Sequence, residues 1–302
     1  MTPEAFGLRP SAFKIAAALV SLSVAIGCST TTPNVLTIAT TTSVQNSGLL
    51  DRMLPAVEEA TGLTVRVHAT GSGRALRMLA DGDVDAIISH SPDAEASYLQ
   101  AHPAWSYRKW AYNSFAVVGP ENDPAGVRDA VDVPHAFRLL ADSSVTFVSR
   151  GDASGTHERE EQFWTMASRR PGADRLLVSG RGMAQALRHA SEVRGYTLTD
   201  LPTYWQLGSA IDLSVLFENN PALLNTYAVI HPPGNRGAET FVSWWFSDAG
   251  RAALESFLID GRRAFEAWPN ECASSVPTDV PGCQGARMPR VPRVPRIDAS
   301  TG

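Results

Sequence analysis

The sequence predicts an α/β fold in which helices cover a mostly parallel sheet. Short runs of β-branched residues alternate with windows whose apolar residues recur at helical spacing. No segment recurs at a fixed period, which argues against a solenoid. The 302 residues are enough for two α/β domains or one large one even after loss of an N-terminal leader.

The alternation fixes the expected order of elements along the chain. The expected strands are Leu36–Thr41, Val65–Thr70, Asp85–Ser89, Ser114–Gly119, Thr146–Ser149, Leu213–Phe217 and Tyr227–His231. The expected helices are Leu49–Thr61, Arg74–Asp81, Ala136–Ala141, Ser154–Ser168, Met183–Glu192, Leu201–Leu207, Glu239–Phe246 and Gly250–Leu258. Phe115–Val118 and Ala228–Ile230 are apolar and far apart in sequence, so we expect them to cross between the two lobes.

The N-terminus predicts export from the cytoplasm. Residues 1–28 have the pattern of a signal peptide, with Arg9 and Lys14 ahead of the apolar stretch Ile15–Ile26. This stretch is too short to indicate a transmembrane span. We therefore expect a protein of the periplasm or the cell surface.

Cys28 follows Ala25-Ile26-Gly27, which resembles a bacterial lipobox. The resemblance implies that Cys28 becomes the lipidated first residue of the mature protein. Ala25 stands where a Leu is usual, so a plain cleaved signal stays the alternative. In the lipidated case the chain is anchored to the membrane through Cys28.

The C-terminal segment 269–302 is rich in proline and has the composition of a disordered tail. It contains Cys272 and Cys283. Because an exported protein meets an oxidising compartment, we expect these two cysteines to form a local disulfide.

The charge balance excludes one class of partner. The formal net charge is −5, whereas nucleic-acid binding normally requires a basic face. A small anion stays possible, because a buried anion responds to local donors and dipoles.

The segment Ser149–His157 has the residues of an oxyanion site. It places a guanidinium, hydroxyls and glycines directly ahead of the helix expected from Ser154. Unpaired N–H groups and the helix dipole favour anions at that end. Arg150 adds five N–H donors, and Asp152 is placed to hold that side chain. The simpler alternative is a capped helix with a surface Arg–Asp pair.

Polar residues also follow the first three strands, where ligands gather in open α/β sheets. Thr40-Thr41-Thr42-Ser43 follows the first strand, Gly71-Ser72-Gly73 the second, and Ser89-His90-Ser91 the third. The alternative for the first of these is a hydroxyl-rich turn that caps its own helix. Taken with Arg150, the three loops supply donors from both halves of the chain.

These segments resemble the tungstate-binding proteins of bacterial ABC importers, the TupA family of extracytoplasmic solute-binding proteins. The similarity runs from about Leu36 to about Leu258, with departures at Ser114 and at Leu201-Pro202. The motifs that carry it are Ala39–Ser43, Asn46–Leu50, Gly82–Asp85, Val117–Pro120, Asp123–Gly126, Ser149–His157, Gly182-Met183 and Tyr196–Asp200.

The resemblance implies a type II periplasmic-binding-protein fold, with two lobes joined by two crossing strands. On this interpretation residues 34–116 plus 228–268 form the first lobe and residues 117–227 form the second. A monomer would bind tungstate or molybdate between the lobes, without a metal or another cofactor, and deliver it to a membrane permease. The implied contacts are Thr41, Thr42, Ser43, Ser72, Arg150, Ser154, Gly155 and Thr156. Which of Thr41 and Thr42 touches the anion stays open.

Protonation distinguishes the candidate anions. Phosphate keeps a proton near neutral pH and favours a carboxylate acceptor, whereas tungstate and molybdate are unprotonated and require donors only. In phosphate-binding proteins of this fold an Asp follows the third strand, and the corresponding residue here is His90. His90 is therefore a candidate donor to the anion. A phosphate or sulfate receptor and a surface-anchored sensor stay as alternatives.

The sequence does not predict an enzyme. His157-Glu158 begins a zinc-protease pattern, but the second His is replaced by Glu161. The sequence contains no Gly-x-Ser-x-Gly nucleophile elbow, and Gly180-Arg181-Gly182 lacks the third glycine of a dinucleotide site.

Overall fold

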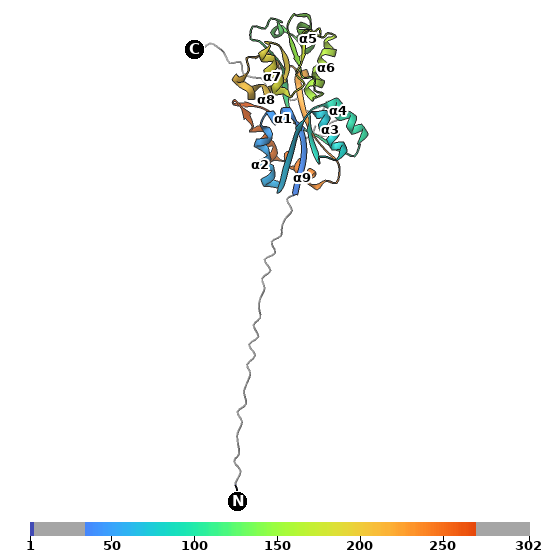
Figure 1. The fold of residues 1–302 in the computed structure, drawn as a ribbon, viewed down its shortest axis with the longest axis vertical. Helices are drawn as coiled ribbons and strands as arrows, with labels where there is room; N and C mark the ends of the chain where they lie inside the picture. Colours follow the sequence, from blue (N-terminus) through green and yellow to red (C-terminus); the bar gives the residue numbers. More distant parts are fainter. Residues whose placement is uncertain (3–33, 270–302) are drawn as a thin grey trace. The chain divides into compact units, whose positions relative to one another are not determined.

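The computed structural model describes residues 1–2 and 34–269, in which strands and helices alternate along much of the chain (Figure 1). The sequence did not predict the strands Leu176–Val178 and Thr197–Asp200, and the strand expected from Ser114 begins at Ser106. The longer strands are β1 (Asn34–Thr41), β2 (Leu63–Thr70), β3 (Ala86–Ser89), β4 (Ser106–Gly119), β5 (Phe147–Ser149), β6 (Leu176–Val178), β7 (Thr197–Asp200), β8 (Ser214–Phe217) and β9 (Leu224–His231). The strands β10 (Leu258–Ile259), β11 (Arg262–Arg263) and β12 (Glu266–Ala267) are short.

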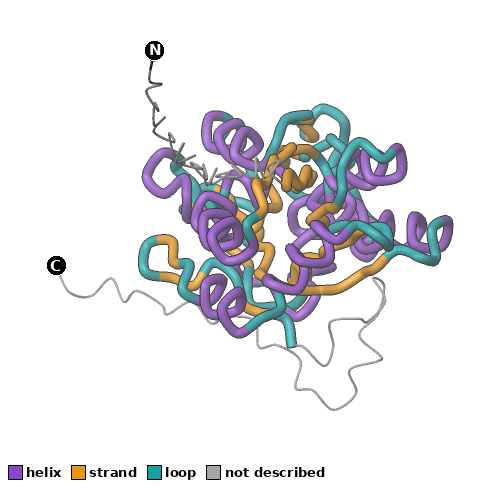
Figure 2. The backbone as a smooth tube through the Cα atoms, turned by 90° about the horizontal axis from the view of Figure 1, so that it is seen from below, coloured by secondary structure: helices purple, strands orange, loops and turns teal. Residues whose placement is uncertain are grey.

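The helices lie around these strands (Figure 2). They are α1 (Thr42–Asn46), α2 (Leu49–Thr61), α3 (Ser72–Asp81), α4 (Pro92–Ala101), α5 (Val133–Asp142), α6 (Gly155–Ala167), α7 (Met183–Glu192), α8 (Leu201–Leu207), α9 (Arg236–Trp245) and α10 (Asp248–Glu255).

The main sheet is mixed, so the expectation of a mostly parallel sheet is wrong. Its order is β12-β4-β9-β3-β1-β2, in which β1 is parallel to β2 and to β3. By contrast, β9 is antiparallel to β3 and to β4. The parallel part holds the βα units that end in the polar loops. The antiparallel part is built from β4 and β9, which connect distant parts of the chain.

The strand β4 belongs to two sets of strand pairs. Its residues Ser106–Ser114 pair with β9, and Phe115–Gly119 pair with β7 and β8. The expected crossing segment Phe115–Val118 thus begins where β4 changes partners. We call the elements around β1, β2, β3 and β9 the first lobe, and those around β5 to β8 the second lobe. The other expected crossing segment, Ala228–Ile230, pairs with β3 and β4 inside the first-lobe sheet, so that expectation is wrong.

Each lobe has its own apolar core. In the first lobe, Ile38, Met53 and Phe241 are fully buried together. In the second, Phe137, Phe147 and Trp164 pack edge to face. Figure 1 shows α5 and α6, of the second lobe, at one end of the folded part, and α2 and α9, of the first lobe, at the other.

Two helices were not predicted. The first, α1, is five residues long, and its first two residues are hydroxylic. The second, α4, begins with a proline and carries alternating small and acidic residues, so its apolar periodicity is weak. Both helices begin directly after a strand of the first lobe, and each presents its N-terminus at the end of that strand.

Outside the described residues lie residues 3–28 of the predicted signal peptide, with Cys28, and residues 270–302 of the tail, with Cys272 and Cys283. Within the described part, every helix is too short or too polar to span a membrane.

Candidate functional site

The Arg150 side chain is the centre of the second-lobe half of the site. It follows β5 and is 1% exposed. Its Nη2 lies 2.6 Å from Oδ2 of Asp152, and its Nη1 lies 3.5 Å from the sulfur of Met183. Its Nε is buried and has no hydrogen-bond partner among the described residues. A buried donor without a partner is costly, so this atom indicates a ligand.

Two carboxyl groups position the Arg150 loop. Asp152 accepts from the guanidinium and from the Ser154 N–H at 3.3 Å. Burial raises the pKa of Asp152, but Arg150 and Ser154 together lower it by a larger amount. The pKa of Asp152 therefore lies below its ordinary value. Glu160 accepts from the backbone N–H of Arg150 at 3.1 Å. The prediction that Asp152 holds Arg150 in place is confirmed.

The N-terminus of α6 adds hydroxyl donors. Ser154 is the N-cap, as predicted, and its Oγ accepts from the His157 N–H at 3.3 Å. Thr156 is fully buried, and its Oγ1 has no partner among the described residues. Gly155 begins the helix between these two residues.

The first-lobe half begins where β1 ends. Thr41 is 2% exposed and is the N-cap of α1, with Oγ1 accepting from the Val44 N–H at 3.3 Å. Thr42 is half-buried, and Ser43 is buried in the first turn of α1. The expectation that this hydroxyl run caps its own helix is thus confirmed for Thr41.

Ser72 and His90 come from the next two strand ends of the first lobe. Ser72 is fully buried at the start of α3, and its Oγ accepts from the His90 N–H at 3.4 Å. The His90 ring stacks on Tyr227 with centroids 5.1 Å apart. Its Nδ1 lies 3.0 Å from Oδ1 of Asn225, whose Nδ2 donates to Asn113 and to Tyr227.

The neighbours of His90 fix its protonation. Burial lowers the pKa of His90 to about 4, so the ring is neutral at pH near 7. Because the Asn225 oxygen can only accept, the ring proton lies on Nδ1. The Nε2 atom is then an acceptor. The donor role predicted for His90 is not available in this tautomer.

Close contacts join the two halves. A Cβ atom at Gly155 would lie 2.2 Å from the backbone oxygen of His90. A Cβ atom at Gly71 would lie 3.9 Å from the Cα of Ser154, and one at Gly182 would lie 3.3 Å from Oγ1 of Thr42. The structure therefore brings the predicted residues of both lobes to one seam, and only a glycine fits at position 155.

The hydroxyl groups of this seam share one geometry. Thr41 and Ser72 each accept a backbone N–H, and their own O–H groups have no acceptor among the described residues. Ser154 also accepts a backbone N–H, but its hydroxyl is hydrogen-bonded to Asp152 as well. The backbone bond fixes the oxygens of Thr41 and Ser72 and leaves their protons free to be donated. With Arg150 and Thr156, these groups are donors suited to an anion.

Sequence analysis missed two polar groups. Thr40 Oγ1 is buried and has no partner among the described residues, although Thr40 belongs to the hydroxyl run already noted. Asp200 is the N-cap of α8, and its Oδ2 is likewise buried without a partner. Burial raises the pKa of Asp200. In the sequence, only the Tyr196–Asp200 motif includes Asp200, and that motif does not indicate a role for it.

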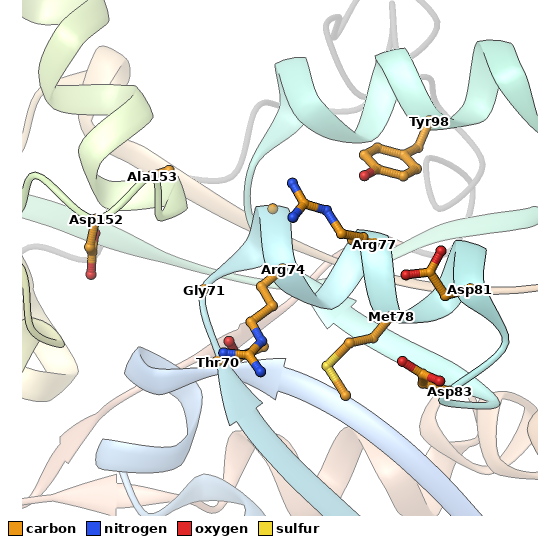
Figure 3. A pocket seen from close by; sticks show the side chains of 11 residues that line it. Thr70, Gly71, Arg74, Arg77, Met78, Asp81, Asp83, Tyr98, Asp152 and Ala153 are labelled. Carbon is orange, nitrogen blue, oxygen red and sulfur yellow. The ribbon is translucent and has the colours of Figure 1, made fainter.

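A groove of about 740 Å³ lies beside the seam. It is lined on the α3 side by Arg74 and Arg77 and on the other by Asp152 and Ala153 (Figure 3). Both arginines are exposed. Across the described ranges, His, Cys, Asp and Glu residues form no group of three or more that could hold a metal ion.

The fold and this seam define a two-lobed binding protein. The model of the PBP superfamily domain matches residues 28–249, and the chain belongs to that family. Within it, the chain is 35% identical to the tungstate-binding protein TupA of Peptoclostridium acidaminophilum over 229 residues, covering 73% of this chain and 80% of the relative.

Solved structures agree with this family. The tungstate ABC transporter protein of Geobacter sulfurreducens is 35% identical with a TM-score of 0.67, and the match covers 74% of this chain and 98% of that one. TupA of Desulfovibrio alaskensis G20 is 34% identical, also with a TM-score of 0.67, over 78% of this chain and 99% of that one. These relatives are binding proteins, and the periplasmic-binding-protein fold predicted from the sequence is confirmed.

Proposed function

We propose that this protein is the extracytoplasmic component of an ABC importer that captures tungstate, and also molybdate, and delivers it to a membrane permease. It acts by binding and release, without a catalytic step, a metal or another cofactor. The full chain is exported as a monomer and anchored through lipidated Cys28. The similarity to tungstate-binding relatives over most of the chain supports this assignment.

One observation carries the proposal. Arg150 is buried with a free Nε, next to a helix N-terminus whose Thr156 hydroxyl is also unpaired. Charge-assisted hydrogen bonds contribute about 1.5–3 kcal/mol each. A nanomolar site needs about 12 kcal/mol, which six such donors on rigid elements can supply.

The donor set suits an unprotonated dianion. The oxygens of Thr41 and Ser72 each accept a backbone N–H, so their hydroxyl protons can be donated to an anion. The Asp152 carboxylate is already occupied by Arg150 and Ser154. An anion that carries no proton needs only hydrogen-bond donors, and these groups supply them.

The test is binding of four anions to the purified full chain. Tungstate and molybdate should raise the melting temperature and give calorimetric affinities far tighter than those of sulfate and phosphate. Competition between tungstate and molybdate then ranks the two. If none of the four anions shifts the melting temperature, the proposal is wrong, and the result favours the alternative of a surface-anchored sensor. Hydrolysis of a phosphate ester would contradict the absence of catalysis.

His90 favours one second candidate, a phosphate receptor. Its neutral ring carries a lone pair on Nε2, and this atom can accept the proton that phosphate retains. The same four-anion comparison decides: tighter binding of phosphate than of tungstate would select this candidate.

A further inference from the structure

A second set of contacts, which includes none of the anion donors, joins the lobes. The N-terminus of α4, in the first lobe, contacts α6 in the second. The Ser91 hydroxyl donates to Oε2 of Glu158, and the Asp93 N–H donates to Oε1 of Glu158 at 3.0 Å. Gln162, one turn further along α6, donates to Oδ2 of Asp93 at 2.7 Å.

We propose that Glu158 is the positioning residue that keeps the lobes closed over the bound anion, with Ser91 and Asp93 as its partners. The inference rests on the proposed function, because it explains how the bound anion is retained. Glu158 donates nothing to the ligand, and its effect is on the escape of the ligand.

The chemistry of the contact supports this role. A carboxylate that accepts an N–H in the first turn of α4 is favoured by the helix dipole as well as by the two hydrogen bonds. Ser91 is 2% exposed, so its hydroxyl is shielded from water. Charge-assisted bonds of this kind exist only while the two lobes touch, and breaking them is part of every opening event.

Other charged groups surround the contact. Arg159, on α6, interacts electrostatically with both Glu158 and Asp93. Its Nη1 donates to Oε1 of Gln162 at 3.0 Å. Glu95, on α4, accepts from the Ser91 N–H at 2.9 Å. Glu158 accepts two hydrogen bonds across the gap between the lobes, and Asp93 accepts a third from Gln162.

The chain offers a matched control on the same helix. Glu161, three residues beyond Glu158, pairs with Arg170 and His157, all within the second lobe. E158Q and E161Q each remove one negative charge from α6, but only E158Q weakens a bond between the lobes. A conservative amide also keeps the size of the side chain.

The experiment measures tungstate dissociation by stopped flow for the full chain and its variants. We expect E158Q and S91A to raise the dissociation rate by about tenfold, with little change in the association rate. The double variant should add little to either single change. An E158Q dissociation rate equal to that of the wild type, or an equal rise in E161Q, overturns the inference.

X-ray scattering without ligand separates this inference from the proposed function. E158Q should give a larger radius of gyration than the wild type and E161Q, because its lobes open more often. If the wild type binds no anion, the proposed function fails while this comparison still tests Glu158. Equal radii together with equal rates would leave Glu158 without a role in closure.

Discussion

The two halves of the seam each bury an ionisable side chain, and the two side chains differ in their partners. The second lobe buries Arg150 with an unpaired Nε beside the anion donors. The first lobe buries Glu95, whose Oε1 accepts from the Ser91 N–H. Arg150 retains donor capacity that a ligand can use, whereas the Glu95 carboxyl is occupied by the protein.

This difference assigns separate tasks to the lobes. Under the proposed function, the second lobe supplies the fixed charge that attracts and holds the anion. The first lobe supplies hydroxyl groups, such as those of Thr41 and Ser72, together with the surface on which α6 closes. Affinity should therefore respond most to the second lobe, and stability should respond most to the charge buried in the first.

Arg150→Ala should produce the largest effect. It removes the buried guanidinium, and we expect tungstate affinity to fall by about a hundredfold, which corresponds to about 3 kcal/mol. Isothermal titration calorimetry measures the change. The control is Arg169→Ala, an exposed residue of the second lobe whose ion pair with Asp142 spans 3.9 Å. Unchanged affinity in Arg150→Ala would contradict the proposal that the second lobe holds the anion.

Glu95→Gln should change stability in a way that depends on pH. Burial raises the pKa of Glu95 from 4.5 to about 7. Between these values the folded protein holds a proton that the unfolded chain releases, so the wild-type protein loses stability as pH rises from about 4.5 to 7. At about 1.4 kcal/mol per pKa unit, the loss is at most about 3 kcal/mol.

The Gln variant does not titrate, so it should gain on the wild type by up to this amount across the same interval. Urea unfolding at about pH 4 and about pH 8 measures the gain. Glu239→Gln, an exposed position on α9, is the control for loss of a charge. A constant difference between Glu95→Gln and the wild type at both pH values would contradict the assignment.

The sequence predicted the second-lobe half of the site better than the first-lobe half. The cap at Ser154, the role of Asp152 and the start of α6 follow from local rules that act within nine residues, Ser149 to His157. The His90 prediction depended instead on Asn225, which is 135 residues away along the chain. No local pattern shows that this amide fixes the ring proton on Nδ1.

The contacts between lobes were also beyond local rules. Nothing near Gly155 in the sequence shows that the His90 carbonyl will lie against it, or that Glu158 will meet Ser91. The mixed sheet has the same origin. The antiparallel pairing of β9 with β3 joins residues far apart in the chain, and periodicity within each strand does not indicate its direction.

Gly155→Ala should have a smaller effect on affinity than Arg150→Ala. The added methyl group would meet the His90 backbone oxygen, which cannot move aside as a side chain can. Overpacking of this kind costs about 1–3 kcal/mol, so we expect affinity to fall by about tenfold, with the lobes held apart. Calorimetry and X-ray scattering with saturating tungstate measure the two changes.

Gly73→Ala is the matched control for the Gly155→Ala substitution. A Cβ atom at Gly73 would lie 3.6 Å from the Ala153 oxygen, which is ordinary contact across the same seam. Affinity should then stay close to that of the wild type. Equal losses in Gly155→Ala and Gly73→Ala would show that any added methyl group disturbs the seam, and the specific fit of α6 on the first lobe would be wrong.

Arg77→Ala should have the smallest effect, because it tests whether the first lobe also attracts the anion. Arg77 is exposed and lines the groove beside the seam (Figure 3), so we expect it to act on an approaching anion through its electrostatic field. We expect the association rate to fall by about twofold at low salt and to be unchanged at high salt. Arg138→Ala, an exposed arginine on α5, removes the same charge from the second lobe away from the groove. If Arg77→Ala raises the dissociation rate instead, Arg77 contacts the ligand, and the first lobe supplies a charge as well as hydroxyl groups.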